Sequence, residues 1–231
     1  LDADIYGPSM PRMFGLQGQQ PESRDGKSLV PLEAYGLQVM SIGFLVDEAA
    51  PMVWRGPMVT SALNQLLRQT LWEDLDYLIV DMPPGTGDIQ LTLSQTVPVA
   101  GALIVTTPQD IALSDARKGL EMFRKVSVNV LGIVENMRIY RCPSCGDEAS
   151  LFGQGGGERL AADAGTTLLG ELPLAADIGL AVDSGRPSVI AEPDGEAARH
   201  YRQIAISAGA ELAASRRDYS SAFTRIVVED T

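Results

Sequence analysis

DYLIVDMPPGTGD, the stretch from Asp76 to Asp88, indicates the fold class. Its apolar run ends in Asp81 and does not alternate with polar residues, as in a β-strand buried on both faces of a sheet. The loop that follows is rich in glycine, so its backbone N–H groups could approach a phosphate without a Cβ in the way. We therefore expect Asp81 to hold Mg²⁺, directly or through water, with Gly85 and Thr86 beside the phosphates of a nucleotide.

The same loop has a simpler interpretation as an ordinary strand-to-helix turn in which Asp88 caps the next helix. The beginning of the chain favours the nucleotide interpretation, because Asp2 and Asp4 indicate a second strand end that carries acid. Ligands of open parallel sheets bind beyond the carboxyl ends of the strands. Two acidic strand ends therefore favour a nucleotide site over a plain turn.

Apolar runs alternate with helical patterns along the chain, which predicts an α/β fold with a mostly parallel sheet and helices on both faces. Strands are expected at 77–81, 102–106, 130–134 and 167–170. Apolar residues at three-to-four spacing predict helices over 58–71, 113–123 and 198–212. We also expect a hairpin over 30–42, broken at Gly36, a mobile polar loop over 17–28, and a tail over 215–231 with a short strand near 226–228.

Composition excludes several classes of function. The formal net charge of −12 would repel a phosphate backbone, so we expect no nucleic-acid partner. No apolar run approaches the roughly 20 residues of a membrane helix, and no secretory leader is visible, so we expect no membrane partner. The single histidine, His200, makes a multi-histidine metal site improbable. Two cysteines cannot form a disulfide framework, which favours a cytoplasmic protein with reduced thiols.

Those cysteines, Cys142 and Cys145, form a Cys-x-x-Cys motif in a loop after the 130–134 strand. The spacing is typical of half a metal site, with a redox dithiol and two incidental thiols as alternatives. Four ligands would require a second chain, most simply an identical one across a two-fold axis, so we expect a homodimer. The spacing does not separate Zn²⁺ from a [4Fe–4S] cluster.

Several motifs together resemble the Mrp/ApbC family of deviant P-loop ATPases, which is related to MinD and ParA. They are Leu1–Ser9 (LDADIYGPS), Val53–Pro57 (VWRGP), Asp76–Asp88, Thr106–Asp110 (TTPQD) and Glu135–Met137 (ENM). The resemblance extends from residue 1 to about residue 213 and implies a doubly wound P-loop NTPase fold. We accordingly expect an ATPase-like domain over 1–214, with the Cys-x-x-Cys loop at 137–150, followed by the 215–231 tail.

The resemblance also implies roles for individual residues. Asp4 would orient the attacking water, and Asp81 would be the carboxylate near Mg²⁺. Gly85 would contact the γ-phosphate, Asn136 would read the adenine edge, and Pro173 would form a wall of the base pocket. For the cysteine pair, the resemblance favours the [4Fe–4S] cluster.

One motif of that family, a Gly-Lys-Gly-Gly-Val-Gly-Lys-Ser phosphate-binding loop, does not occur in this sequence. Gly26-Lys27-Ser28 is similar to its end, but Pro21 occupies the position where the pattern needs glycine. Gly153–Gly157 precedes a helix without a following lysine, which favours close packing over phosphate binding. Since the chain opens on Leu1 without an initiator methionine, we expect a fragment that lacks the first strand and this loop, and binds ATP weakly or not at all.

The resulting hypothesis is a homodimeric carrier that transfers a [4Fe–4S] cluster to apo-proteins, with ATP hydrolysis by the intact protein coupled to the cycle. One rival is a positioning ATPase of the MinD/ParA type that delivers no metal. The other is a non-catalytic dimer stapled by Zn²⁺.

Overall fold

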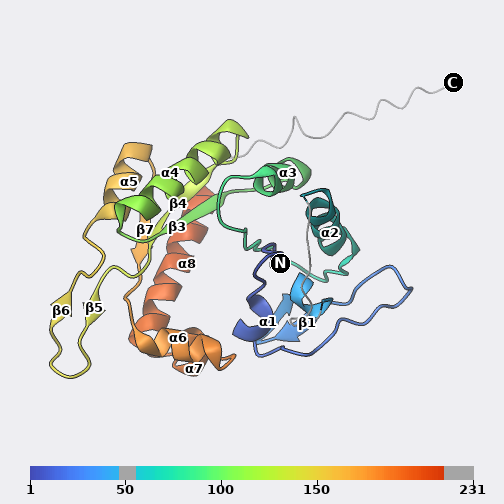
Figure 1. Ribbon diagram of the computed structural model, residues 1–231, viewed down its shortest axis with the longest axis horizontal. Helices are drawn as coiled ribbons and strands as arrows, with labels where there is room; N and C mark the ends of the chain where they lie inside the picture. Colours follow the sequence, from blue (N-terminus) through green and yellow to red (C-terminus); the bar gives the residue numbers. More distant parts are fainter. Residues whose placement is uncertain (47–55, 216–231) are drawn as a thin grey trace.

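The computed structural model describes residues 1–46 and 56–215 (Figure 1). Its helices are α1 (Met10–Met13), α2 (Gly56–Gln69), α3 (Asp88–Thr96), α4 (Asp110–Lys125), α5 (Gly156–Ala164), α6 (Ala176–Asp183), α7 (Ser188–Ala191) and α8 (Glu196–Ala214), with a 3-10 turn, η1, at Ile42–Phe44. Its strands are β1 (Leu32–Ala34), β2 (Leu37–Val39), β3 (Ala102–Thr106), β4 (Val130–Glu135), β5 (Tyr140–Arg141), β6 (Glu148–Ala149) and β7 (Leu168–Glu171). The expected motif at 53–57 lies mostly outside these residues, as does all of the predicted tail except Ser215.

The central sheet has the strand order β3-β4-β7, and both pairings are parallel. Helices α4 and α5 cover one face and α8 covers the other, as Figure 1 shows. Successive side chains of β4 point to opposite faces of the sheet, as along any strand. Ile133 packs into the cluster with α4 and α5, and Val134 into the cluster with α8. The predicted α/β architecture, with helices on both faces of a parallel sheet, is confirmed.

A third cluster of buried residues lies around the start of the chain, η1, α2 and α3. Residues 1–3 run beside both residues 40–41 and residues 79–81, through parallel bridges from Asp2 to Ser41 and to Asp81. Two contacts near α6 connect this half to the half that holds the sheet. The hydroxyl of Tyr35 donates to the carbonyl of Gly185 at 2.6 Å, and Arg12 lies 3.8 Å from Asp183.

The predicted hairpin is confirmed as β1 and β2, which pair antiparallel through a two-residue turn at Tyr35 and Gly36. Both turn residues have positive φ, 54° and 76°, as a hairpin turn of the twisted type I′ requires. The predicted helices over 58–71, 113–123 and 198–212 correspond to α2, α4 and α8.

The prediction of a strand buried on both faces at 77–81 is wrong. The segment pairs on one side with the start of the chain, where Asp81 N–H donates to Leu1 O at 2.9 Å and Ala3 N–H donates to Asp81 O at 2.8 Å. Within the described residues its other edge has no partner strand. Tyr77 and Ile79, whose side chains lie on the same face of this segment, are 67% and 74% exposed, so that face is uncovered. An apolar run becomes a buried strand only where neighbours cover it, and here one side is open.

Candidate functional site

Three acidic residues gather where residues 1–4 meet Asp81. Asp2 is buried and accepts hydrogen bonds from Ser41 Oγ at 2.8 Å, Asp4 N–H at 3.2 Å and Met10 N–H at 3.3 Å. Asp4 is less buried, and its Oδ1 accepts from the N–H groups of Tyr6 and Gly7 at 3.2 and 3.3 Å. Asp2 therefore holds the backbone in place, while Asp4 presents its carboxylate outward.

Burial and mutual repulsion oppose the ionisation of Asp2 and Asp81. Burial raises the pKa of Asp2 above its ordinary range, against the lowering effect of its hydrogen bonds. Partial burial also raises the pKa of Asp81, and repulsion from Asp2 and Asp4 adds to the effect. A cation placed beside Asp81 would relieve this repulsion, as expected for a carboxylate near Mg²⁺.

A cavity of about 470 Å³ opens beside Asp4. Its lining residues are Asp4, Tyr6, Gly7, Pro83, Pro84, Gly87 and Gln90. The wall opposite Asp4 belongs to the Pro-Pro-Gly loop, in which Gly85 has φ +97° and both Gly85 and Thr86 are exposed. The structure thus brings the predicted residues Asp4, Asp81, Gly85 and Thr86 into one region. Of these four, Asp4 lines the cavity, whereas Asp81, Gly85 and Thr86 do not.

Sequence reasoning missed Gln90, which is 4% exposed at the beginning of α3. Its Nε2 donates to the carbonyl oxygens of Pro83 and Pro84, at 3.0 and 3.2 Å. The signal that could have found it is its position, third in a helix that follows directly on a loop, where a glutamine side chain commonly reaches back to the backbone.

Asn136 and Pro173 lie at the corresponding carboxyl ends of β4 and β7. Asn136 follows Glu135, whose register partner on β7 is Glu171. Backbone bonds continue past the ends of the strands: Leu172 N–H donates to Glu135 O at 2.8 Å, and Arg138 N–H donates to Leu172 O at 3.0 Å. The structure therefore brings Asn136 and Pro173 to the same edge of the sheet.

This pairing continues to the cysteines. Leu174 N–H donates to Ile139 O at 2.8 Å, and Tyr140 bridges to Leu174 in parallel. We call residues 136–141 and 172–174 the strap. One end of the strap holds Asn136, and the other runs into the β5–β6 hairpin that carries the thiols, at the far left of Figure 1.

Cys142 and Cys145 are free thiols in the turn of this hairpin, and Cys145 is exposed. Cys142 N–H donates to Asp147 O and Gly146 N–H donates to Cys142 O, both at 2.9 Å, and Gly146 adopts φ +79°. The amide N–H groups of Cys145 and Ser144, followed by the thiol of Cys145, lower the pKa of Cys142. Amides directed at a sulfur favour the thiolate, which is the form that binds a soft metal.

Ion pairs connect the hairpin to the body. Arg141 lies 2.7 Å from Glu148 across the hairpin and 3.3 Å from Glu196 at the start of α8. Within the described residues, no group of three or more His, Cys, Asp or Glu side chains could hold a metal ion. Cys142 and Cys145 are thus a pair of thiols without a third such ligand beside them among the described residues.

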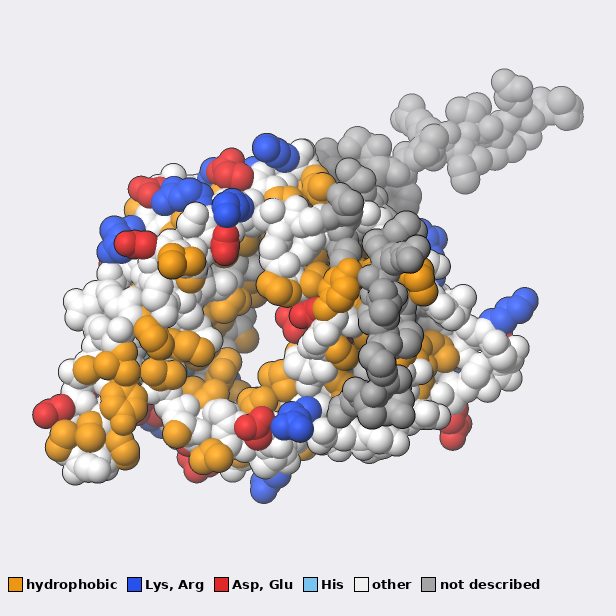
Figure 2. All heavy atoms as spheres, viewed as in Figure 1, with side chains coloured by type: hydrophobic (Ala, Val, Ile, Leu, Met, Phe, Trp, Pro, Cys, Tyr) orange, Lys and Arg blue, Asp and Glu red, His pale blue; other side chains and the backbone are white. Residues whose placement is uncertain are grey.

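The predicted residues form two groups, with the acidic cavity in one half of the molecule and the strap with the thiols in the other. Figure 2 shows a hollow that passes between these halves. The open edge of β3 belongs to the sheet half, where Leu103 and Val105 are 42% and 63% exposed. The described residues therefore do not place Asn136 and Asp4 in one continuous pocket.

The glycine run at Gly153–Gly157 packs closely, as the sequence predicts. Gly157 N–H donates to Oε2 of Glu135, a fully buried carboxylate. A Cβ at Gly157 would lie 2.9 Å from Glu135 Cβ, closer than real side-chain contacts allow. Glu135 Oε1 has no hydrogen-bond partner within the described residues. The run thus provides a close approach between α5 and β4.

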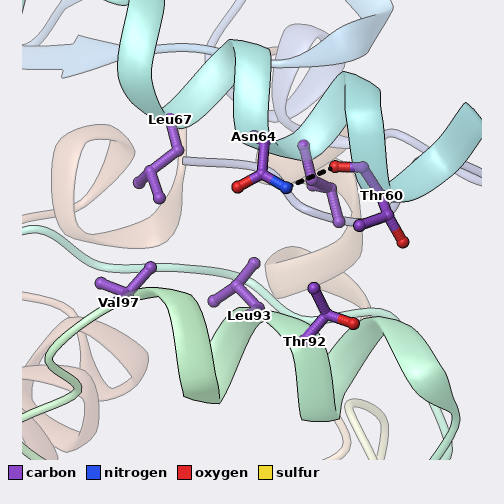
Figure 3. A pocket seen from close by; sticks show the side chains of 7 residues that line it. Thr60, Asn64, Leu67, Thr92, Leu93 and Val97 are labelled. Carbon is purple, nitrogen blue, oxygen red and sulfur yellow. Dashed lines mark hydrogen bonds between the residues drawn. The ribbon is translucent and has the colours of Figure 1, made fainter. Parts of the chain in front are cut away.

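A second, very small cavity of about 10 Å³ lies between α2 and α3 (Figure 3). Its labelled side chains come from both helices, and the amide of Asn64 donates to Thr60 O at 3.0 Å. That volume holds at most one water, so the cavity is a packing defect between helices.

Comparisons with known proteins agree with this geometry. A nucleotide-binding protein from Archaeoglobus fulgidus, solved in complex with ADP, superposes with a TM-score of 0.70 and 36% identity, over 84% of this chain and 75% of that one. The cell division ATPase MinD of Pyrococcus furiosus shares the fold with a TM-score of 0.62 at 18% identity, over 90% of this chain and 84% of that one. The fold is thus that of the MinD/ParA class of P-loop NTPases.

Within that class, residues 1–208 match the model of the family described as ParA, NUBPL iron-transfer P-loop NTPase, and the chain belongs to this family. It is 59% identical to an iron-sulfur cluster carrier protein of Pseudomonas fragi, over 92% of this chain and 74% of that protein. It is 55% identical to the protein of the same name in Escherichia coli K12, over 92% of this chain and 58% of that protein. It is also 53% identical to the mouse iron-sulfur cluster transfer protein NUBPL, over 89% and 64%.

The chain thus spans little more than half of the Escherichia coli relative. In the described part of the chain, no helix is both long and apolar enough to span a bilayer.

Proposed function

We propose that this protein carries an iron–sulfur cluster and transfers it to apo-proteins. The observation that carries the proposal is the pair of free thiols on the β5–β6 hairpin, with Cys142 partly buried and Cys145 exposed. Relatives at 53–59% identity, named as cluster carrier or transfer proteins, support it. The cluster is cargo, so an accessible site from which it can leave suits the task better than a buried one.

The proposed cargo is a [4Fe–4S] cluster shared by two copies of the chain. Two thiolates leave half of the iron ligands unsupplied, and a two-fold axis beside the hairpin would provide the other half. Hydrophobic side chains gather over the β5–β6 hairpin in Figure 2, and Leu151 close by is 59% exposed. Apolar surface around the thiols would favour contact between two such hairpins. Reduced thiols also agree with a cytoplasmic location.

The proposed nucleotide is ATP with Mg²⁺. Asp81, whose ionisation is opposed by its neighbours, would hold the metal through water, and the metal would supply charge compensation for the phosphates. The Oδ2 atom of Asp4 accepts no hydrogen bond from the described residues, so it is free to orient a water molecule in the cavity. Gly85 and Thr86 would offer backbone N–H groups to the phosphates. Asn136 and Pro173 would contact the adenine base.

The strap supports coupling between nucleotide and cluster. Asn136 and Cys142 lie six residues apart on a segment that is bonded to residues 172–174 along most of its length. A backbone movement at Asn136, where the adenine base would bind, would therefore be transmitted to the thiols through backbone pairing rather than through a flexible linker.

Anaerobic reconstitution of the chain with iron and sulfide tests the carrier proposal. We expect one [4Fe–4S] cluster per two chains, visible by absorption and metal analysis, and loss of the cluster in the Cys142→Ala/Cys145→Ala variant. Ser144→Ala, which leaves both thiols in place, is the matched control. A double variant that keeps iron and sulfide at the wild-type ratio would exclude the proposal.

The same measurements distinguish the rivals. Zinc without visible absorption would indicate a dimer stapled by Zn²⁺. Absence of both metals, with nucleotide binding retained, would indicate a positioning ATPase. Transfer is then tested by mixing the loaded protein with an apo iron–sulfur enzyme and measuring the recovered activity.

A further inference from the structure

The Pro83–Gly87 loop has an unusual supply of hydrogen-bonding groups. Its two prolines carry no N–H group, so at those positions the loop offers carbonyl oxygens only. Gly85 follows with φ +97°, and Gly87 is extended at the start of α3. The two prolines cannot donate backbone hydrogen bonds within the loop, so their carbonyl oxygens depend on donors from other residues.

One side chain supplies those donors. The Nε2 amide of Gln90 lies 3.0 Å from the oxygen of Pro83 and 3.2 Å from the oxygen of Pro84. Only the NH₂ end of a glutamine carries two donors, so two carbonyl acceptors define which way this amide points. Gln90 is 4% exposed, and its backbone carbonyl accepts from Ser94 Oγ at 2.7 Å, a bond within α3 that does not involve the amide side chain of Gln90.

Gln90 also lines the cavity that Asp4 faces. The side chain therefore connects the first turn of α3 to the proline carbonyls, beside the cavity that Asp4 also lines. Its other amide atom lies against the end of the loop, since the position that a Cβ would take on Gly87 is 3.5 Å from Gln90 Oε1. One buried amide thus bonds to the proline end of the loop and lies near its glycine end.

We propose that Gln90 is a positioning residue that holds the Pro83–Gly87 loop in the conformation seen here. Both of its hydrogen bonds would have to break when the loop moves toward a bound phosphate. Gln90 thus acts through the loop without touching the reacting atoms. Its importance for hydrolysis rests on the proposed function, whereas its hold on the loop can be measured without any nucleotide.

The test is the backbone order of Gly85, Thr86 and Gly87 from ¹⁵N relaxation of the complete chain. We expect order parameters of about 0.85 in the wild type and values below about 0.6 in Gln90→Glu and Gln90→Met. Glutamate keeps the shape but, when ionised, offers no donor and faces two carbonyl oxygens. Methionine keeps the bulk and has no charge. Ser94→Ala, one turn further along α3, is the matched control and should leave the loop rigid.

The pH dependence separates a donor from mere packing. The protonated carboxyl group of the Gln90→Glu variant carries one O–H donor, and burial raises the pKa of such a group. Loop order in Gln90→Glu should therefore recover in part as the pH falls from 8 to 5, whereas Gln90→Met should stay mobile throughout. Rigid loops in both variants, or equal behaviour of the two across this pH range, would overturn the proposal.

Thermal unfolding midpoints show whether Gln90→Glu or Gln90→Met has lost its fold. If one of them has, the loop order of the other is compared with the wild type. A chain that binds no Mg²⁺–ATP leaves the loop measurement intact, because that measurement uses no nucleotide. A rigid loop in the variants would remove the role of Gln90 and leave the proposed function standing.

Discussion

The hydroxyl of Ser41 donates a 2.8 Å hydrogen bond to the carboxylate of Asp2, and both side chains are buried. This bond joins the start of the chain to the beginning of η1. Because Asp2 also accepts from the amide of Asp4, the same carboxylate supports the residue that faces the cavity. The hydrogen bonds of Asp2 thus stabilise the local backbone, while the burial of its carboxyl group opposes ionisation.

A pH dependence of stability follows from Asp2. Burial raises its pKa above the ordinary value of 3.8, so the folded chain binds this proton more tightly than the unfolded chain does. The contribution of Asp2 is therefore greatest below pH 3.8 and is lost as the pH rises through the raised pKa. We expect the stability of wild type relative to Asp2→Asn to fall with rising pH over this window, as measured by urea unfolding.

The control for that prediction is Asp25→Asn. Hydrogen bonds from Ser28 and Lys27 lower the pKa of the exposed Asp25, so its contribution has the opposite sign: it is present above the ordinary pKa and is lost as the pH falls. An identical pH trend for the two variants would contradict the assignment.

Two glycine-to-alanine substitutions should have opposite effects. Gly157→Ala would place a Cβ 2.9 Å from Glu135 Cβ, and we expect a loss of about 1–3 kcal/mol from overpacking. Gly179 lies within α6 with no atom near its Cβ position, so Gly179→Ala should gain about 0.5–1 kcal/mol in helix propensity. Chemical denaturation measures both. A tolerated Gly157→Ala would mean that α5 does not pack on Glu135 as described.

Ile133 is the buried centre of the sheet. It has no exposed surface and packs against α4 and α5, so Ile133→Ala should cost about 2–5 kcal/mol. For a chain of this size we expect the thermal midpoint to fall by about 2–4 °C per kcal/mol. Ile206→Ala on α8, where the side chain is 65% exposed, should change stability by less than about 0.5 kcal/mol. Similar losses for the two would contradict the described burial.

The thiol of Cys142 should react at lower pH than an ordinary cysteine. The amides of Cys145 and Ser144 lower its pKa, so its alkylation in the reduced, metal-free chain should begin at lower pH than that of a cysteine in a short unstructured peptide. Ser144→Pro removes one of these N–H groups and should move the alkylation profile toward higher pH. Ser144→Ala keeps the N–H group and should move it less. Mass spectrometry of the labelled peptide gives the rates, and superposable profiles for the two variants would exclude the role of the amide.

Much of the fold could be predicted because local pattern and burial agree. The apolar runs at 102–106 and 130–134 form the parallel strands β3 and β4. Helices cover β4 on both faces, as its composition predicts, whereas β3 is covered on one face and leaves Leu103 and Val105 exposed on the other. Gly36 marked the hairpin because its turn needs positive φ. The run at 77–81 has the same composition, but strand formation depends on partners, and only one side of it is paired.

The candidate site was predictable to a smaller extent. Cys142 and Cys145 were visible because metal-binding thiols need close spacing in the sequence, and Asp4, Asp81 and Asn136 because their motifs resemble a known family. Gln90 and Glu135 were missed, since each acts on backbone groups of another segment. The division between a domain at 1–214 and a tail at 215–231 stays a prediction.

The sequence by itself determined the parallel α/β class, the pair of thiols and the acidic residues, because these depend on residue type and spacing along the chain. Only the tertiary structure decided that Asp2 is buried beside Ser41, that Gln90 donates to the proline carbonyls, and that the strap leads from Asn136 to the hairpin that carries Cys142. Apart from proline, every residue has the same backbone donor and acceptor, so their partners follow from which segments fold side by side.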